Sequence, residues 1–432
     1  MPITEIIAKK RDRGELSAEE IAAAVSSFTR GQVSDAQMAA LLMAIVLNGM
    51  SARESADLTM AIVDSGDRLD LSAIPGTKVD KHSTGGVGDK TTLVVAPLVA
   101  ALGVPVAKMS GRALGHTGGT IDKLEVIRGL RTGLTPKQFV KQVSRIGIAI
   151  AAQSARMAPA DKKIYALRDA TATVESIPLI ASSVMSKKLA AGADAIVLDV
   201  KSGGGAFMPD VARAGDLARL MVDIGAHHGK RMVALVTRME QPLGRAVGDA
   251  VELAEAVETL RGSGPDDLVE LCVVLAGHML VLGGAAADLS EGCSRARQGI
   301  ASGIGLAKLA EMVVAQGGDP APLDCPDLLT RGVEQLPITL ACPGLIVGIK
   351  ARQIGLAIRD LKAAAGEGKR SCGVVLKRKV GEAAEGDPVA VLLYPAGTRD
   401  AALEAAACIR AAFSTGEAAP ESGPLVAGAF SS

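Results

Sequence analysis

The sequence is poor in aromatic residues and has no excess of either charge. Its 432 residues include no Trp, two Tyr and five Phe. A protein that binds single-stranded nucleic acid by stacking bases on aromatic rings is therefore not expected. The 47 Lys and Arg residues balance the 47 Asp and Glu residues, so neither a basic nucleic-acid surface nor an acidic tail is indicated.

Long apolar runs and a leader segment are also lacking. The two longest uncharged apolar stretches, 91–107 and 271–287, are interrupted by proline, glycine or histidine and fall short of the about 20 apolar residues that span a membrane. The N-terminus runs directly into the charged segment 9–13, without the apolar core of a signal peptide. We therefore expect a cytoplasmic protein that has no membrane partner.

Cysteine and histidine do not form a metal-binding pattern. All six cysteines lie from Cys272 onward, and none belongs to a C-x-x-C pair. They are interpreted as reduced thiols of a cytosolic protein. The adjacent His227 and His228 would point about 100° apart on a helix, which makes a poor metal pair. The sequence therefore predicts neither a zinc site nor a disulfide framework.

The first 65 residues are typical of a small helical bundle. Capping boxes of the form S-x-x-E/Q begin at Ser17, Ser34 and Ser51, and each precedes an apolar run of helical period. At about 150 residues per domain the chain has room for roughly three domains, and the pattern changes after this bundle.

From about residue 75, short apolar runs alternate with segments of helical length. Strands are predicted at 104–107, 195–200 and 232–237, and the first two enter glycine-containing loops. This order favours an α/β domain with a largely parallel central sheet. Ligands of such sheets bind beyond the carboxyl ends of the strands, where these loops fall.

The last hundred residues change character again. Segments 371–381 and 387–394 are rich in β-forming residues and flank a glycine-containing turn. They predict a smaller C-terminal α+β domain. The tail after Gly416, rich in Ala, Gly, Ser and Pro, is expected to fray.

Two glycine-rich segments carry the clearest chemical signal. Residues 81–92 read KHSTGGVGDKTT and residues 110–120 read SGRALGHTGGT. Glycine allows backbone N–H groups to converge on an anion, and hydroxyl groups with a Lys ammonium complete the shell. Neither segment is a Walker A motif or a dinucleotide-binding fingerprint. We predict anion binding, although tight turns with surface hydroxyls would have the same composition.

A third group of polar residues follows at 165–169 and 180–188. Ser183 and Lys187 are four residues apart and would share one face of a helix. Arg168 can supply a planar, two-pronged donor to a ring that carries carbonyl groups. An ordinary solvated helix face would look the same, so the residues alone leave this interpretation open.

Taken together, these segments resemble the thymidine/pyrimidine-nucleoside phosphorylase family, and the pyrimidine-nucleoside branch most closely. The most diagnostic block is SGRALGHTGGTIDKLE at 110–125, and segments 81–89, 160–169, 176–188 and 194–208 agree as well. The resemblance covers residues 1–300 well and the rest more loosely. It implies reversible phosphorolysis of uridine, thymidine and deoxyuridine to the free base and (deoxy)ribose 1-phosphate.

The resemblance also implies roles for individual residues. The positions that match the phosphate site are Lys81, Ser83, Thr92, Lys108, Ser110 and Thr120. Those that match the pyrimidine site are His82, Arg168, Ser183 and Lys187, with Leu114, Ile180 and Phe207 as apolar walls. Inorganic phosphate is the implied co-substrate, and no organic cofactor is implied.

Three of these residues are the implied catalytic groups. Arg168 and Lys187 would stabilise the negative charge that grows on the departing pyrimidine. His82 would donate a hydrogen bond or a proton to that ring, because histidine ordinarily titrates near neutrality. Phosphate would attack C1′ of the sugar from the opposite side.

The family architecture implies three domains and a homodimer. The helical domain comprises 1–65 with about 160–190, the α/β phosphate-binding domain 70–158 with 191–330, and the C-terminal α+β domain 331–432. Because base and phosphate contacts fall on different domains, a hinge would close the site. The apolar helix at 39–46 is a candidate face for the second subunit.

A potassium site of the family is altered in this sequence. The matching positions are Gly88, Lys90, Leu243, Ala246 and Glu255, and a Thr is usual at Lys90. The Lys90 ammonium would take the place of the ion and pair with Glu255, which makes potassium binding doubtful. Alternatively, Lys90 points outward from the start of a helix.

Two further positions depart from the usual pattern. Ala113 replaces a Gly, which would matter if that position requires a positive φ. Lys108 stands where strict thymidine phosphorylases have Met, and it suits the branch that also accepts uridine. A strict thymidine phosphorylase therefore stays open as an alternative, as does an anthranilate-type phosphoribosyltransferase, whose loops are similar but which would need acidic Mg²⁺ ligands.

Overall fold

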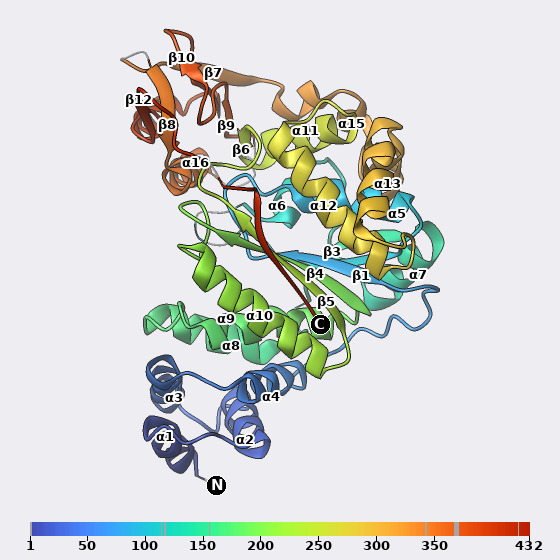
Figure 1. The fold of residues 1–432 in the computed structure, drawn as a ribbon, viewed down its shortest axis with the longest axis vertical. Coiled ribbons are helices and arrows are strands. Elements are labelled where there is room, and N and C mark those ends of the chain that lie inside the picture. Colours follow the sequence, from blue (N-terminus) through green and yellow to red (C-terminus); the bar gives the residue numbers. More distant parts are fainter. Residues whose placement is uncertain are drawn as a thin grey trace.

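Four N-terminal helices form a bundle at one end of the molecule. The computed structural model describes residues 2–113, 115, 118–154, 156–341, 344–366, 371–421 and 423–432. The four helices are α1 (Ile3–Arg11), α2 (Ala18–Thr29), α3 (Asp35–Asn48) and α4 (Ala52–Val63) (Figure 1). The predicted capping boxes at Ser17, Ser34 and Ser51 are all formed. The apolar faces of the bundle share a core with α8 (Pro159–Ala170) and with the first turn of α9 (Ile177–Ala190).

A parallel sheet crosses the middle of the molecule, as the apolar runs predicted. Its strands, in spatial order, are β1 (Val79–Ser83), β4 (Ala195–Ser202), β5 (Arg231–Arg238) and β13 (Val426–Ser431). The first three are parallel, and β13 is antiparallel to β5. A second parallel pair, β2 (Val106–Ser110) and β3 (Ile148–Ala152), continues beside β1, where Val79 N–H donates to the carbonyl of Pro105 at 3.2 Å.

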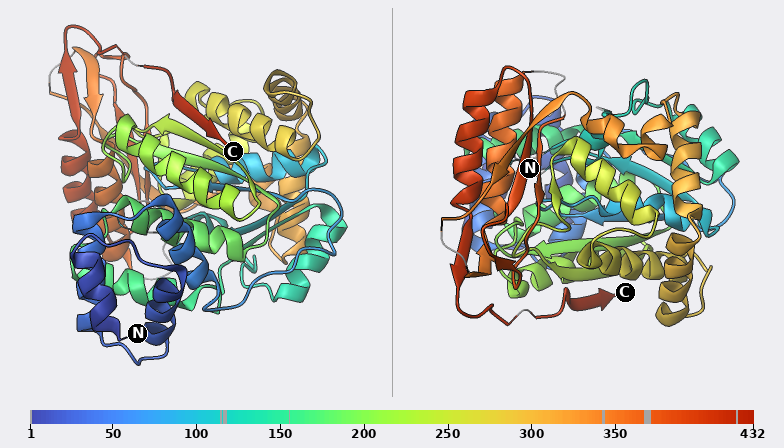
Figure 2. Two further views of the ribbon diagram at one scale, coloured as in Figure 1. Left: turned by 60° about the horizontal axis from the view of Figure 1, so that its bottom comes forward. Right: turned by 90° about the horizontal axis from the view of Figure 1, so that it is seen from above.

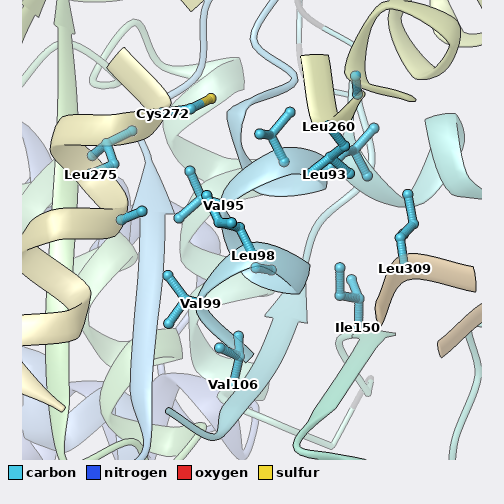
Figure 3. Packing of buried hydrophobic residues seen from close by; sticks show 14 of the residues in the cluster. Leu93, Val95, Leu98, Val99, Val106, Ile150, Leu260, Cys272, Leu275 and Leu309 are labelled. Carbon is cyan, nitrogen blue, oxygen red and sulfur yellow. The ribbon is translucent and has the colours of Figure 1, made fainter. Parts of the chain in front are cut away.

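Helices cover both faces of this sheet. One face carries α5 (Thr91–Ala101), α11 (Asp249–Leu260), α12 (Asp266–Leu282), α13 (Leu289–Ala301) and α14 (Ile304–Ala315). The other face carries α7 (Pro136–Ile146), α9 and α10 (Val211–His227). Figure 3 shows how α5 fills the first face, with Leu93 and Val99 packed among residues of the neighbouring helices and strands. Because all these side chains are fully buried, α5 is held firmly beneath the loops at its N-terminus.

The end of the chain is ordered, and the expectation that it frays is wrong. Residues Val426–Ser431 form β13 at the edge of the central sheet, and the Phe430 ring lies 5.1 Å from the guanidinium of Arg219. The abundance of Ala, Gly and Ser around Val426 and Phe430 concealed this strand. In Figure 1 the final segment, in dark red, runs from the C-terminal domain back to the sheet.

The C-terminal part is an α+β unit with its own core. One sheet has the order β6 (Ala246–Val247), β9 (Gly373–Leu376), β11 (Ala390–Pro395), β7 (Val333–Ile338), and another has β10 (Ala383–Ala384), β8 (Gly344–Ile349), β12 (Phe413–Gly416). Helices α16 (Ala351–Ala365) and α17 (Arg399–Arg410) pack against them. Figure 2 shows this unit, in orange and red, along the side of the α/β domain. Strand β6 comes from the α/β part, so the two parts share a sheet.

The remaining helices are short. They are α6 (Thr120–Leu124), α15 (Ala321–Asp324) and the 3-10 helix Pro326–Thr330. Within the described part of the chain, no helix combines the length and the apolar character needed to cross a bilayer. The predicted fold class, a small helical domain with a larger α/β domain and a C-terminal α+β domain, is confirmed.

Candidate active site

Strand β1 divides the candidate site, because successive side chains of a strand point to opposite faces of the sheet. Val197, the register partner of Lys81, belongs to the core on the α5 face. Leu198, the partner of His82, belongs to the core on the α9 face. Lys81 and Ser83 therefore face α5 with the glycine-rich loops, whereas His82 faces the helix that carries Ser183 and Lys187.

The α5 side gathers the first group of predicted phosphate ligands. Lys81 Nζ donates to Thr91 Oγ1 at 2.5 Å and lies 3.4 Å from the Asp199 carboxylate. Ser83 Oγ accepts a hydrogen bond from the N–H of Gly85 at 3.1 Å. Thr92 is buried in the first turn of α5. An ammonium, two hydroxyls and a helix N-terminus thus lie at one end of β1, which suits an anion.

A buried lysine joins this group to the second loop. Ser110 ends β2, and Thr120 begins α6, whose Ile121 N–H donates to the carbonyl of Gly111 at 3.4 Å and so keeps the start of this helix at the carboxyl end of β2. Lys123, one turn further on, donates to the Asp89 carbonyl and pairs with Glu252, both at 2.6 Å. Burial opposes ionisation of Asp89, but the charges of nearby lysines outweigh it and hold the pKa well below its ordinary value.

The second loop is held by the acidic residues that follow it. Arg112 makes two hydrogen bonds of 2.8 Å to Glu125, and the N–H of Ala113 donates to Asp122 at 2.6 Å. These contacts agree with a role for both carboxylates in orienting the loop. Ala113 has no positive φ, so the position does not require glycine.

The predicted apolar walls are only partly described. Leu114 lies outside the described residues. The Phe207 ring lies about a van der Waals contact from Gly115, where an added Cβ would be 3.9 Å from it. Phe207 is 37% exposed. Ile180 is half-buried on α9.

Ser183 and Lys187 share a face of α9, as their spacing predicted. Lys187 Nζ donates to Ser183 Oγ at 3.1 Å and to Asp161 at 2.5 Å. The Lys187 side chain is 26% exposed, whereas Ser183 is mostly buried. The pair therefore presents a hydroxyl and an ammonium together, and Asp161 on α8 fixes the ammonium.

Arg168 is placed differently from the sequence expectation. It is 1% exposed, and each nitrogen of its guanidinium donates to a backbone carbonyl: Nε to Thr173, Nη1 to Leu179 and Nη2 to Val174. The guanidinium also lies 5.4 Å from the Tyr165 ring. In this conformation Arg168 organises the turn between α8 and α9. Contact with a pyrimidine remains a prediction, in which the two other N–H groups of the guanidinium would become accessible.

The protonation state of His82 also differs from the expectation. Burial, followed by the positive charges of Lys188, Lys108, Lys81 and Lys187, lowers its pKa well below the ordinary 6.5. The imidazole is therefore neutral near pH 7 and serves as a hydrogen-bond donor. A negative charge growing on a bound ring would favour its protonation, because it offsets the surrounding cations.

Sequence reasoning missed a buried ionic group beside His82. Lys188 Nζ on α9 donates to Asp80 at 2.9 Å and to the Met109 carbonyl at 3.2 Å. Lys108 Nζ lies 3.3 Å from Asp80 and donates to the Lys81 carbonyl at 2.6 Å. Burial lowers the pKa of Lys108 to about 7, and Asp80 limits this effect. Strand 79–83 reads VDKHS and holds a single apolar residue, so its local pattern gave no signal that Asp80 would be buried.

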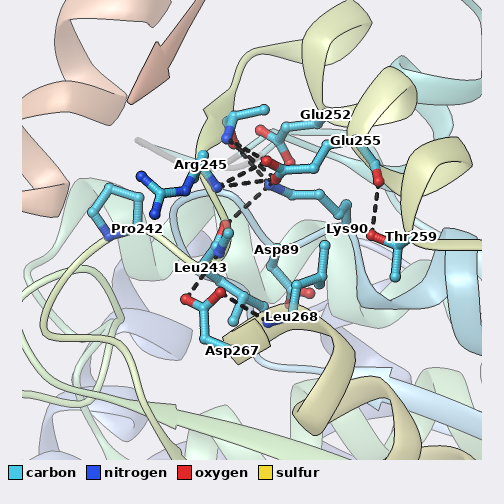
Figure 4. A network of polar contacts seen from close by, with 12 residues as sticks. Asp89, Lys90, Pro242, Leu243, Arg245, Glu252, Glu255, Thr259, Asp267 and Leu268 are labelled. Carbon is cyan, nitrogen blue, oxygen red and sulfur yellow. Dashed lines mark hydrogen bonds and ion pairs between the residues drawn. The ribbon is translucent and has the colours of Figure 1, made fainter. Parts of the chain in front are cut away.

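Lys90 points inward and lies among the oxygens of the predicted potassium site. Its Nζ donates to the carbonyls of Leu243 at 3.0 Å and Ala246 at 2.8 Å, and to Glu255 at 2.5 Å (Figure 4). A Cβ on Gly88 would come within 2.6 Å of the Leu243 carbonyl, so glycine is required for this close approach. These residues do not fit a potassium ion, because the ammonium already uses their oxygens.

The fold and the site together place ammoniums, hydroxyls and a helix N-terminus at the carboxyl ends of parallel strands, beside donors from a helical domain, an arrangement that suits an anion-binding α/β enzyme. Two family models match the chain: "Glycosyl transferase family, helical bundle domain" at residues 4–66 and "Glycosyl transferase family, a/b domain" at residues 75–306. The chain belongs to this glycosyl transferase family.

Relatives with assigned activities agree over most of the length. The chain is 51% identical to the pyrimidine-nucleoside phosphorylase of Bacillus subtilis (strain 168), over 91% of this chain and 92% of that protein. It is 50% identical to that of Staphylococcus haemolyticus (strain JCSC1435), over 88% and 89%. The enzyme of the same name from Geobacillus stearothermophilus is 49% identical over 91% and 92%.

A solved structure supports the fold. Anthranilate phosphoribosyltransferase from Thermus thermophilus superposes with a TM-score of 0.59 and 22% sequence identity, over 72% of this chain and 98% of that one. At this identity the likeness concerns the architecture alone.

Proposed function

We propose that the protein is a pyrimidine-nucleoside phosphorylase, a pentosyltransferase that catalyses reversible phosphorolysis of pyrimidine nucleosides. The observation that carries this function is the identity of about half of all residues to three pyrimidine-nucleoside phosphorylases over about nine-tenths of the chain. The reaction yields the free base and (deoxy)ribose 1-phosphate, with inorganic phosphate as co-substrate.

The geometry supports phosphate binding on one face of β1 and base binding on the other. On the α5 side, Lys81 and the hydroxyls of the glycine-rich loops bind phosphate and direct it at C1′. On the α9 side, Lys187 and Ser183 bind the pyrimidine and neutralise the charge that develops as the glycosidic bond breaks. His82 donates from a neutral imidazole to the same ring. Arg168 joins them through its two further N–H groups once the turn that buries it opens.

The proposed substrates are uridine, thymidine and deoxyuridine. Lys108 supports the inclusion of uridine, because its buried amino group lies between the Lys81 carbonyl and Asp80, next to the residues proposed to bind phosphate and base, where we propose that it contacts a sugar hydroxyl or phosphate. A strict thymidine phosphorylase is the second candidate. It would turn over thymidine and deoxyuridine but not uridine, so a direct comparison of the three nucleosides decides between them.

We propose further that no potassium ion is needed. The Lys90 ammonium supplies a fixed positive charge to Leu243, Ala246 and Glu255. Activity should therefore be equal in sodium and potassium buffers, and strong activation by potassium would overturn this proposal. No organic cofactor takes part in the proposed reaction.

A cytoplasmic homodimer that acts in nucleoside salvage is also proposed. The apolar stripe of α3 is used within the bundle, since Leu41 and Ile45 are buried there. The opposite face leaves Leu47 75% exposed and Met43 37% exposed, which suits a partner surface. Size measurement in solution by light scattering tests the dimer.

The decisive experiment follows release of uracil or thymine by ultraviolet absorbance. Uridine, thymidine and deoxyuridine are each incubated with the enzyme, with and without phosphate. Phosphate-dependent release of base is expected. Release that does not depend on phosphate, or no release, would contradict the function. A parallel reaction of anthranilate with a pyrophosphorylated ribose phosphate and Mg²⁺ tests the phosphoribosyltransferase alternative.

A further inference from the structure

The short segment 242–246, between β5 and α11, has every backbone carbonyl satisfied by a donor from outside the segment. Lys379 Nζ donates to the carbonyls of Pro242 and Gly244, and the Gly244 distance is 2.7 Å. Lys90 Nζ donates to the carbonyls of residues 243 and 246. The carbonyl of Arg245 accepts the N–H of Leu376 at 2.7 Å.

Three of the four N–H groups of the same segment donate to two carboxylates. Glu255 accepts from the N–H groups of Arg245 at 2.9 Å and Ala246 at 3.1 Å. Asp267 accepts from the N–H of Gly244 at 3.2 Å and also pairs with Lys379 at 3.0 Å. Two ammoniums and two carboxylates thus enclose five residues that have no regular structure until β6 begins. Such a fully bonded segment has little freedom to move.

The two lysines come from different parts of the chain. Lys90 is the N-cap of α5 in the α/β domain. Lys379 follows β9 in the C-terminal domain and is 8% exposed. Burial lowers its pKa, and Asp267 partly offsets that effect. Neighbouring contacts strengthen the junction, because the N–H of Val380 donates to the Gln241 side chain at 3.1 Å.

The enclosed segment lies directly against the phosphate side of the site. The N–H of Leu243 donates to the Val87 carbonyl at 3.1 Å, inside the first glycine-rich loop. Lys90 is followed at once by Thr91, the hydroxyl partner of Lys81, and by Thr92. A shift of segment 242–246 would therefore move both the loop and the N-terminus of α5.

We propose that Lys379 is a positioning residue through which the C-terminal domain holds the phosphate-binding loop and the N-terminus of α5 in place. This inference rests on the proposed function. Lys379 does not touch the reacting groups, and it acts through segment 242–246 and Lys90. Its removal should weaken phosphate binding and leave nucleoside binding almost unchanged, since the base-binding residues lie on the opposite face of β1.

The test compares Lys379→Met with Lys377→Met in the full-length enzyme. Lys377 is exposed and two residues away, so it is a matched control. We expect Lys379→Met to raise the KM for phosphate about tenfold, or about 1.4 kcal/mol. The KM for the nucleoside should change less than twofold. Calorimetric titration of the free enzyme with inorganic phosphate should show the same loss, and Lys377→Met should match the wild type.

Two results would overturn the proposal. Equal increases in the KM for phosphate and for nucleoside would mean that Lys379 only stabilises the fold, and unchanged constants would mean that it has no role. If Lys379→Met does not fold, Lys379→Gln, which keeps a hydrogen-bond donor, is judged by the same criterion. A wild-type enzyme that does not cleave nucleosides with phosphate would count against the proposed function instead.

Discussion

The two sides of the candidate site handle positive charge in different ways. On the phosphate side, Lys81, Lys90 and Lys123 have side chains at most 3% exposed, and each is fixed by partners on other elements. On the base side, Lys188 is equally buried against Asp80, but Lys187, the residue assigned to the ring, is 26% exposed and bonded to Ser183 of its own helix and to Asp161 of α8. Arg168 is buried but bonded within its own turn.

This difference indicates which half is ready for its ligand. Charges locked into a buried network need little reorganisation when an anion arrives, so the phosphate side is preorganised. Three of the five N–H groups of Arg168 already donate to carbonyls and the residue is 1% exposed, so a ring can reach the other two only if the surrounding turn opens. We therefore expect phosphate to bind to an existing site, and the pyrimidine to bind with a rearrangement of the α8–α9 turn.

Among these tests, replacing Lys90 should have the largest effect, because it removes a fixed charge from the preorganised phosphate side. Lys90→Thr removes a buried ammonium and should lower the free energy of unfolding by about 3 kcal/mol in potassium-free buffer. If the site around Leu243, Ala246 and Glu255 then accepts an ion, potassium should restore both stability and phosphate binding. Thermal unfolding with sodium or potassium measures this. If Lys90→Thr is as stable as the wild type in both buffers, the ammonium contributes little to stability.

Replacing Lys187 should impair catalysis with little effect on stability. Lys187→Met removes the charge that faces the developing negative ring and should lower kcat/KM about 10²- to 10³-fold. Lys162→Met, on the exposed face of α8, is the matched control. Steady-state assays and thermal unfolding separate the two effects. A loss of stability that accounts for the loss of activity would argue against a catalytic role.

Replacing Lys108 should change the choice of sugar. Lys108→Met should lower turnover of uridine about fivefold more than that of thymidine, since one hydrogen bond to a hydroxyl contributes about 1 kcal/mol. Asp80 keeps Lys188 as a partner, which limits the structural cost. Parallel assays with the two nucleosides measure the ratio, and equal losses would exclude a role in sugar selection.

The smallest expected effect concerns the protonation state of His82, which the pH dependence of wild-type activity should reveal. Because its pKa is lowered, the imidazole stays neutral as the pH falls through 6.5. Protonation of His82 should therefore cause no loss of activity at pH 6, whereas a histidine with the ordinary pKa would be about three-quarters protonated there. A profile of kcat/KM between about pH 5 and 8 tests this, and an acid limb centred near 6.5 in wild type but absent from His82→Asn would contradict it.

Much of the fold was predictable because its signals are local. The boxes at Ser17, Ser34 and Ser51 mark helix starts, and the uninterrupted apolar run 195–200 marks a buried central strand. The glycine-rich loops could be placed at the carboxyl ends of strands by the same reasoning. The spacing of Ser183 and Lys187 also predicted their shared helix face.

The contacts that cross the fold were not predictable from local pattern. Asp80 meets Lys188 across 108 residues, and Lys379 reaches Gly244 across 135. The sequence around Asp80, Lys188 or Lys379 does not differ from that around a charged residue that faces solvent. Arg168 shows the opposite problem, because its residue type suits a ligand while the fold gives it three backbone carbonyls. Only the tertiary arrangement assigns these side chains their partners.

The last strand has a practical consequence for handling the protein. β13 occupies the outer edge of β5, and Ser432 Oγ accepts a hydrogen bond from the N–H of Met232 at 3.0 Å. Truncation before Val426 would expose the unpaired hydrogen-bonding groups of β5, an apolar strand. Exposed strand edges pair with other chains and lead to aggregation. Affinity tags are therefore better fused at the N-terminus, and preparations clipped near the end should precipitate first.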